Sequence, residues 1–252
     1  MATWPYPLWI AHRGAGKLAP ENTLAAFRVG AGHGYRAFEC DVKLSADGVP
    51  FLLHDTLLDR TTPERGIAGV REWRELSRID AGGWHGRAFA GEPLPSFDTV
   101  ARFILRNGFS LNLEIKPTEG QEAETAEVVA DAVLRLWHGQ PEPPLLSSFQ
   151  PESLAALRIA APTLPRALLL ETLPDGWLEL ARSLDCAAVV TEYPLMDAAV
   201  RHELRAAGLR ALCYTVNDPA EARRLLRLGI DGLITDAVDR FSPASADEAL
   251  LA

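Results

Sequence analysis

The chain has 252 residues, of which 48% are hydrophobic and 23% charged, a composition typical of a globular protein with a sizeable core. Its formal net charge of −9 argues against binding to nucleic acid or to an anionic membrane by bulk electrostatics. We therefore expect neither partner, and we expect local cations or a metal ion to hold any anionic ligand.

The N-terminus has no basic start followed by a long apolar run, so we expect no secretory signal. No stretch of about 18 apolar residues is present, which predicts no membrane-spanning helix. The three cysteines, Cys40, Cys186 and Cys213, are far apart and odd in number. This argues against a disulfide framework and predicts a cytoplasmic location.

Short apolar runs alternate with amphipathic helical patterns along nearly the whole chain. The candidate strands are residues 8–13, 37–44, 110–116, 144–149, 166–171, 187–193, 210–216 and 231–236. Several helical segments end in glycine, and one begins at Asp218-Pro219, a cap followed by a first-turn proline. Eight strand–helix units in about 250 residues predict a (β/α)8 TIM barrel rather than an open doubly wound sheet, which needs fewer strands.

One segment, residues 56–95, interrupts this rhythm after an additional strand or hairpin at 49–55. It is rich in glycine, proline and charge and shows no sustained periodicity. Irregular connections of this length usually form lids or binding loops. We expect one barrel domain over residues 1–252, with 56–95 as an insertion at the barrel mouth.

The first strand leads into a glycine-containing stretch, "WIAHRGAGKLAPENT" at residues 9–23. A dinucleotide-binding fingerprint would need glycine at position 19, where the chain has Ala19. A P-loop would need glycine at position 11 and serine or threonine at position 18, where the chain has Ala11 and Leu18. Both phosphate-loop interpretations fail on spacing, and we expect these glycines to serve a tight turn instead.

Charged residues alternate with apolar ones on two predicted strands. Glu39, Asp41 and Lys43 share one face of 37–44, and Asn112, Glu114 and Lys116 share one face of 110–116. The apolar faces should pack under the helices, so the charged faces should point into the barrel. Such a cluster is either an internal charge network or a cation site. The absence of interleaved histidine or cysteine favours a hard ion, Mg²⁺ or Ca²⁺.

Two of the six histidines, His12 and His54, end apolar runs. The C-terminal ends of barrel strands carry the active site, so both side chains should reach the same mouth as the carboxylates. Two histidines that titrate near neutrality suit one general base and one general acid. The other four, His33, His85, His138 and His202, are expected to be solvated surface residues.

A lone barrel lysine also suggests a Schiff-base aldolase using Lys116. This alternative is disfavoured because Lys116 lies two residues from Glu114, and a nearby anion favours the charged ammonium, which is a poor nucleophile.

The order HR…ExD…H, formed by His12-Arg13, Glu39-Cys40-Asp41 and His54, resembles the glycerophosphodiester phosphodiesterase family, and in particular its cytoplasmic bacterial members. The similarity continues over nearly the entire chain through "PENTLAAF", "DGVPFLLHDTLLDRTT", "LPSFDTV", "LNLEIK", "YTVN" and "DGLITD". It implies a TIM barrel with a small insertion after the second strand. It also implies hydrolysis of small-molecule glycerophosphodiesters, such as glycerophosphocholine and glycerophosphoethanolamine, to sn-glycerol 3-phosphate and an alcohol.

The resemblance also implies roles for individual residues. One divalent cation, Mg²⁺ or Ca²⁺, would be held by Glu39, Asp41 and Glu114, with His12 and His54 as the acid–base pair. Arg13 and Lys116 are expected near the phosphate. We assign His12 as base and His54 as acid, and the nucleophile is either water or the glycerol 2-hydroxyl.

The chain departs from the family pattern at two positions. Tyr214 stands where the family usually has tryptophan, and Ala237-Val238 follows "TD" where proline is frequent. Both positions concern the wall of the glycerol or alcohol pocket, where Tyr214 is a candidate substrate-binding residue. Two alternative functions are a phospholipase of the same superfamily acting on intact lipids and a non-catalytic barrel that binds a phosphorylated ligand.

Overall fold

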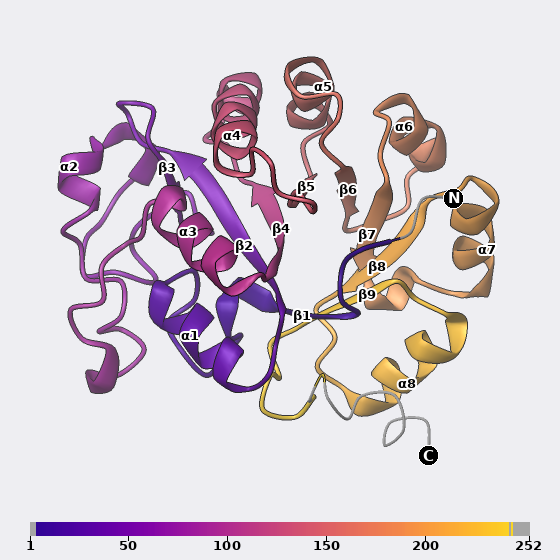
Figure 1. Cartoon of the computed structure of the whole chain (residues 1–252), viewed down its shortest axis with the longest axis horizontal. Helices are drawn as coiled ribbons and strands as arrows, with labels where there is room; N and C mark the ends of the chain where they lie inside the picture. Colours follow the sequence, from indigo (N-terminus) through magenta and orange to yellow (C-terminus); the bar gives the residue numbers. More distant parts are fainter. Residues whose placement is uncertain (1–3, 242, 244–252) are drawn as a thin grey trace.

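The computed structural model describes residues 4–241 and 243, and its centre is a closed barrel of eight parallel strands (Figure 1). The strands follow one another around the barrel in chain order, and β1 pairs with both β2 and β9, which closes the ring. The eight strands are β1 (Trp9–Ala11), β2 (Ala37–Leu44), β4 (Ser110–Ile115), β5 (Leu145–Ser148), β6 (Arg166–Leu170), β7 (Ala188–Glu192), β8 (Arg210–Tyr214) and β9 (Gly232–Thr235). The predicted TIM barrel is confirmed.

All eight predicted strands are present, and β2 has its predicted limits. The others are shorter at one or both ends. The difference matters most at β1, where the chain leaves the sheet after Ala11 and turns through η1 (His12–Gly14). Arg13 and Gly14 both have positive φ angles, of 50° and 97°, so the strand cannot continue through them.

Seven helices connect the barrel strands and surround them (Figure 1). They are α1 (Leu24–Gly32), α3 (Phe97–Asn107), α4 (Glu122–Leu136), α5 (Pro151–Ala160), α6 (Trp177–Ser183), α7 (Ala198–Ala206) and α8 (Pro219–Leu228), and a short 3-10 turn, η4 (Tyr193–Leu195), precedes α7. Local sequence accounts for several ends. Thr23 and Ser96 cap α1 and α3 with their side chains, and Asp218 caps α8 ahead of Pro219.

The two faces of each strand pack in different cores, as the pleat requires. On β7, Val189 belongs to the large apolar core between sheet and helices, whereas the next residue, Val190, points into the barrel. The interior cluster lies below the polar end of the barrel, and Trp4 and Tyr6 pack against it. The Tyr6 hydroxyl donates to the Pro143 carbonyl at 2.9 Å, which fastens the N-terminal segment there.

The segment between β2 and α3 contains the additional strand and residues 56–95, the stretch expected to be an insertion. The strand β3 (Pro50–Leu52) runs antiparallel to β2, and η2 (Ala68–Val70), α2 (Trp73–Leu76) and η3 (Arg87–Phe89) follow it. This segment has a small apolar core of its own, which comprises Phe51, Leu53, Leu58, Ala68, Leu76, Ile79, Ala81 and Leu94. The core gives a firm support to loops that reach the mouth of the barrel.

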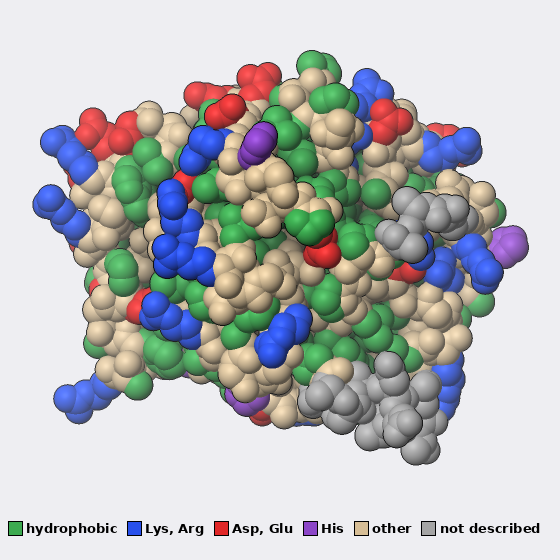
Figure 2. Space-filling model, in the orientation of Figure 1, with side chains coloured by type: hydrophobic (Ala, Val, Ile, Leu, Met, Phe, Trp, Pro, Cys, Tyr) green, Lys and Arg blue, Asp and Glu red, His purple; other side chains and the backbone are tan. Residues whose placement is uncertain are grey.

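The surface view in Figure 2 shows basic, acidic and hydrophobic side chains interspersed on one face, with acidic groups gathered along its upper edge. No helix formed by the described residues combines the length and the apolar character needed to cross a bilayer.

Candidate active site

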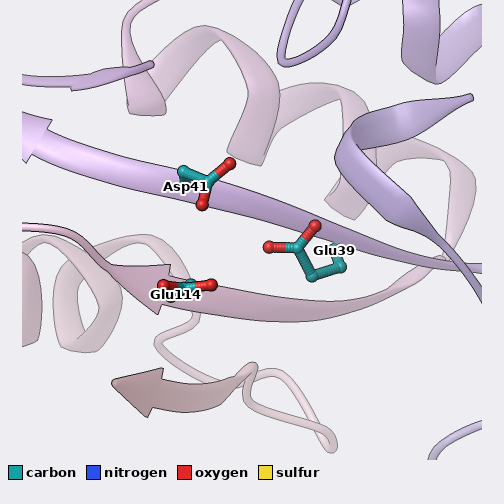
Figure 3. A group of neighbouring side chains, drawn as sticks. All are labelled: Glu39, Asp41 and Glu114. Atoms are coloured by element: carbon teal, nitrogen blue, oxygen red, sulfur yellow. The ribbon is translucent and has the colours of Figure 1, made fainter. Parts of the chain in front are cut away.

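Three buried carboxylates meet on the inner side of two neighbouring strands (Figure 3). Glu39 and Asp41 are on β2 and Glu114 is on β4, where parallel pairing sets Asp41 directly beside Glu114. One carboxylate oxygen from each residue can be chosen so that all three lie within 4.8 Å of one another. The alternation read from the sequence therefore brings together the three residues that it proposed as a cation site.

The chemistry of this cluster fits a hard divalent cation. Glu39 Oε1 and Asp41 Oδ1 are buried and accept no hydrogen bond from any described residue. Burial, with Asp41 and Glu114 nearby, raises the pKa of Glu39, and burial with Asp41 raises the pKa of Glu114 to about 7. Buried anions this close repel one another, and a cation bound by their oxygens would offset that cost.

Arg13 is positioned against this cluster by both its backbone and its side chain. Its backbone N–H donates to Glu39 Oε2 at 3.0 Å, and its Nε lies 3.3 Å from Asp41 Oδ2. Nη1 of the same guanidinium donates to Glu21 Oε1 at 2.8 Å. Although burial raises the pKa of Asp41, the charge of Arg13 contributes to a net lowering, so Asp41 stays ionised.

His12 follows the end of β1 and contacts a carboxylate at the end of β9. Its Nδ1 lies 2.6 Å from Asp236 Oδ1, and Asn217 Nδ2 donates to Asp236 Oδ2 at 3.2 Å. A carboxylate accepts hydrogen bonds, so this contact places the ring proton on Nδ1 of a neutral His12. Nε2 then faces the acidic cluster, 3.8 Å from Glu39 Oε2.

The glycines after His12 were expected to serve a tight turn, and Gly16 also allows the chain to lie close to the end of β9. Gly16 has a φ of 56°, and a Cβ at this position would lie 2.1 Å from the carbonyl oxygen of Asp236. A larger residue here would push the chain away from the end of β9 and weaken the His12–Asp236 contact.

His54 has a comparable support from a different part of the chain. Its Nδ1 lies 2.7 Å from Asp55 Oδ1, and Arg60 donates to both oxygens of Asp55. Arg60 also donates to Glu21, the partner of Arg13, so one network links the two sides of the mouth. Burial, together with Arg13 and Lys116, lowers the pKa of His54 even though Asp41 opposes the shift.

A cavity of about 150 Å³ opens between these groups. Lys116 Nζ lies 3.0 Å from Glu114 Oε1 and 5.4 Å from the centre of the Phe149 ring. The ring of Tyr214 packs edge-on against the Phe149 ring, with 5.8 Å between the centroids, and the Tyr214 hydroxyl donates to the Leu170 carbonyl at 3.3 Å. The candidate residues that line the cavity are His12, Arg13, Glu39, His54, Glu114, Lys116 and Tyr214, and Asp41 is adjacent in the acidic cluster.

Sequence reasoning missed the carboxylates that support the histidines. Asp55 follows His54 directly, and Asp236 ends the last strand motif. Their positions at the ends of apolar runs could have identified them as residues of the barrel mouth. The prediction of a solvated surface position is wrong for His85, which is half-buried and whose Nε2 donates to the Lys17 carbonyl at 3.0 Å. The other three histidines in loops and helices, His33, His138 and His202, are exposed as expected.

Comparison with known proteins identifies relatives over the same span as this fold. The chain matches the glycerophosphoryl diester phosphodiesterase family over residues 12–240. It is 31% identical to a glycerophosphodiester phosphodiesterase from Caldanaerobacter subterraneus, over 91% of this chain and 93% of that protein.

Two solved structures extend the comparison to three dimensions. A phosphodiesterase from Oleispira antarctica, in complex with the product sn-glycerol 3-phosphate, superposes with a TM-score of 0.91 at 34% identity and covers 97% of this chain and 98% of its own. A glycerophosphodiester phosphodiesterase from Agrobacterium tumefaciens gives a TM-score of 0.78 at 29% identity, covering 92% of this chain and 97% of its own.

Proposed function

Because the chain belongs to the glycerophosphoryl diester phosphodiesterase family, we propose that it hydrolyses glycerophosphodiesters to sn-glycerol 3-phosphate and an alcohol, with a divalent cation and two histidines. Glycerophosphocholine and glycerophosphoethanolamine are representative substrates. The observation that carries the proposal is a cavity that two of the three clustered carboxylates and both carboxylate-supported histidines line, with the third carboxylate, Asp41, in the same cluster.

Glu39, Asp41 and Glu114 hold the cation in this proposal, and their all-oxygen donor set suits Mg²⁺ or Ca²⁺. When bound, such an ion supplies positive charge to the non-bridging oxygens of the phosphodiester as negative charge builds up on them. The orphaned oxygens of Glu39 and Asp41 support this assignment, because they would otherwise remain buried without a partner.

Arg13 and Lys116 bind the phosphate from the two sides of the acidic cluster. Each already contacts a carboxylate of the cluster, Arg13 at Asp41 and Lys116 at Glu114. Although burial lowers the pKa of Lys116, the charge of Glu114 raises it overall, so the ammonium stays charged. Fixed cations in a water-poor site stabilise the developing charge without rearranging during the reaction.

His12 acts as the general base through Nε2. The hydrogen bond from Nδ1 to Asp236 orients the ring and stabilises the imidazolium that forms when Nε2 takes a proton from the nucleophile, which is water or the glycerol 2-hydroxyl. Asn217 holds Asp236 in place for this role.

His54 acts as the general acid that protonates the departing alkoxide. In the free site, burial and the cations Arg13 and Lys116 lower its pKa. A bound phosphodiester adds a negative charge that counters these cations, which favours the protonated ring required of a proton donor. Tyr214 and Phe149 form the wall against which the carbon skeleton of the substrate packs.

The proposal places the reaction in the cytoplasm. All three cysteines are free and buried, as expected of a chain that folds without disulfides in a reducing compartment.

The experiment that tests the function is a measurement of sn-glycerol 3-phosphate released from glycerophosphocholine and glycerophosphoethanolamine. The reaction is run with Mg²⁺, with Ca²⁺ and after exhaustive chelation with EDTA. We expect release with at least one cation, loss on chelation and recovery on re-addition. Undiminished release after chelation would rule out the cation-dependent mechanism.

A further inference from the structure

A second cavity, of about 400 Å³, adjoins the catalytic one and has His12 and Arg13 in its wall as well. Its remaining wall comes from the turn after β1, from the end of β9 and from the insertion, through Gly16, Lys17, Glu21, Trp84, His85 and Asp236. Because His12 and Arg13 line both cavities, a phosphate bound by Arg13 lies at their junction. The bridging oxygen of the departing alcohol then stays at the first cavity, whose wall includes His54, and only the rest of the alcohol extends into the second.

On the premise of the proposed function, the sizes of the two cavities suggest which half of the substrate each one binds. The smaller cavity, about 150 Å³, contains the acidic cluster and the Phe149 and Tyr214 walls, and it suits the invariant glycerol half. The larger cavity then receives the alcohol that leaves, which is the half that varies from one substrate to another.

Both carboxylates in the wall of the larger cavity are already engaged. Glu21 accepts hydrogen bonds from Arg13 and Arg60 on its two oxygens. Asp236 contacts His12 through one oxygen and Asn217 through the other. A cationic alcohol entering this space would therefore find no carboxylate without a donor.

Unlike these two carboxylates, the Lys17 side chain is free to bind a ligand. It is exposed, and its ammonium makes no hydrogen bond or ion pair with any residue in the described part of the chain. Lys17 lines the same cavity as Asp236, and although burial raises the pKa of Asp236, His12, Asn217 and Lys17 lower it overall. The Lys17 ammonium thus has three N–H donors that no described residue accepts.

Trp84 supplies a flat apolar wall whose orientation is fixed. Its Nε1 donates to the Ala81 carbonyl at 2.8 Å, and its ring meets the His85 ring edge-on at 5.5 Å. His85 is held in turn by the Lys17 carbonyl, and 42% of Trp84 remains exposed. An exposed tryptophan fastened in this way offers a surface for the C–H groups of a ligand.

We propose that this second cavity is a leaving-group subsite that selects an uncharged polyhydroxylated alcohol over a cationic one. Lys17 donates to the hydroxyl groups of the alcohol, and Trp84 packs against its C–H face. A trimethylammonium group would also be attracted to Trp84. It would, however, share the cavity with Lys17 and Arg13 and meet only carboxylates whose oxygens already accept hydrogen bonds.

The test compares kcat/KM for four esters of glycerol 3-phosphate with saturating cation. Glycerophosphoinositol and glycerophosphoglycerol have polyol leaving groups, whereas glycerophosphocholine and glycerophosphoethanolamine have cationic ones. We expect the wild type to favour the polyol esters by about 10-fold, the scale of one well-placed discriminating contact. Lys17→Glu should lower kcat/KM for the polyol esters and raise it for the choline ester.

Two further variants separate a local from a general effect. Arg28→Glu changes the net charge by the same amount on an exposed α1 residue outside both cavities, and it should leave the substrate ratio unchanged. Trp84→Ala should raise KM for the polyol esters, with Trp84→Phe restoring part of the loss because a flat ring is retained. Thermal melting of each variant confirms that it is folded.

Different outcomes contradict the proposed function and the proposed subsite. Failure to release sn-glycerol 3-phosphate from any of the four esters overturns the proposed function and this inference together. Release from all four, with the choline ester at least as good as the polyol esters, overturns the inference alone. So does a Lys17→Glu variant that changes kcat/KM by one common factor for every substrate.

Discussion

The two histidines share one arrangement and differ in what supports it. Each presents Nδ1 to a carboxylate and so directs Nε2 toward the reacting atoms. Asp236 is held by an amide, Asn217, whereas Asp55 accepts two hydrogen bonds from a guanidinium, Arg60. The Arg60 bonds draw negative charge away from Asp55, so Asp55 stabilises a protonated His54 less than an unpaired carboxylate would.

Leaving groups of different basicity separate the two roles. With alkyl esters, His54→Ala and His12→Ala should each lower kcat by at least ~10²-fold, because each removes a proton-transfer group. With a p-nitrophenyl ester of glycerol 3-phosphate, the departing anion is stable without protonation. His54→Ala should then recover most of its lost rate, whereas His12→Ala should not. Steady-state kcat for both variants on both esters checks this.

The control for this comparison is His202→Ala, which removes an exposed histidine of α7 far along the chain from both candidates and should match the wild type on either ester. Recovery of His12→Ala rather than His54→Ala on the aryl ester would exchange the assigned roles. Equal losses on the two esters would show that His54 donates no proton to the leaving group.

At the level of single residues, the sequence was informative where chemistry and strand position coincide. Glu39, Asp41 and Glu114 follow from alternation, because a one-residue shift would place them under the helices. The supporting contact between His12 and Asp236 spans 224 positions, and only closure of β1 against β9 brings it about. No local pattern in a single sequence specifies such a pairing.

Among the elements, the insertion shows how a loop without periodicity is held in one conformation. The Asp80 carboxylate accepts backbone N–H groups from Gly82, Gly83 and Gly91, closing the turn that carries Trp84 and His85. Across this turn, Glu92 accepts from the Ala25 N–H in the first turn of α1. Strands and helices could be predicted because periodicity encodes them, whereas this turn depends on side chain-to-backbone bonds that leave no periodic trace.

These bonds make the turn sensitive to acid. The N–H groups of Gly91, Gly83 and Gly82 lower the pKa of Asp80. The carboxylate therefore stabilises the fold above its unfolded pKa of ~3.9, and this stabilisation is lost as pH falls through the lowered folded value. Asp80→Asn should reduce the free energy of unfolding by about 1 kcal/mol at pH 7 and pH 5, and by less at pH 3. Urea denaturation at the three pH values measures this.

Asp131→Asn provides the matched control, because it removes the same charge from an exposed position on α4 that makes no hydrogen bond or ion pair with another described residue. It should change the free energy of unfolding little at any pH. A constant difference between Asp80→Asn and the wild type from pH 7 to pH 3 would contradict the role given to the ionised carboxylate.

At the scale of the whole molecule, the barrel has an apolar lower interior and a charged upper interior. Burying the charged groups lowers the stability of the fold. Residues such as Val190 and Leu212 fill the lower part and stabilise the closed sheet. Above them, three buried carboxylates face one another with few internal hydrogen bonds. A fold that tolerates this repulsion gains stability from any cation that removes it, so ligand binding and global stability should be coupled.

Thermal melting distinguishes a cation site from a purely internal charge network. At about 100 times its Kd, a bound cation adds ~2.7 kcal/mol to the free energy of unfolding, which corresponds to a rise in Tm of roughly 5–10 °C for a chain of this size. Glu114→Gln should abolish that rise and increase the Tm of the cation-free protein. It removes from the cluster a carboxyl whose raised pKa makes its ionisation unfavourable near neutral pH. Glu171→Gln, an exposed carboxylate on the same cavity outside the cluster, should keep the cation-induced rise. If the cluster is instead stabilised internally by Lys116, Glu114→Gln will lower Tm and added Mg²⁺ or Ca²⁺ will not change it.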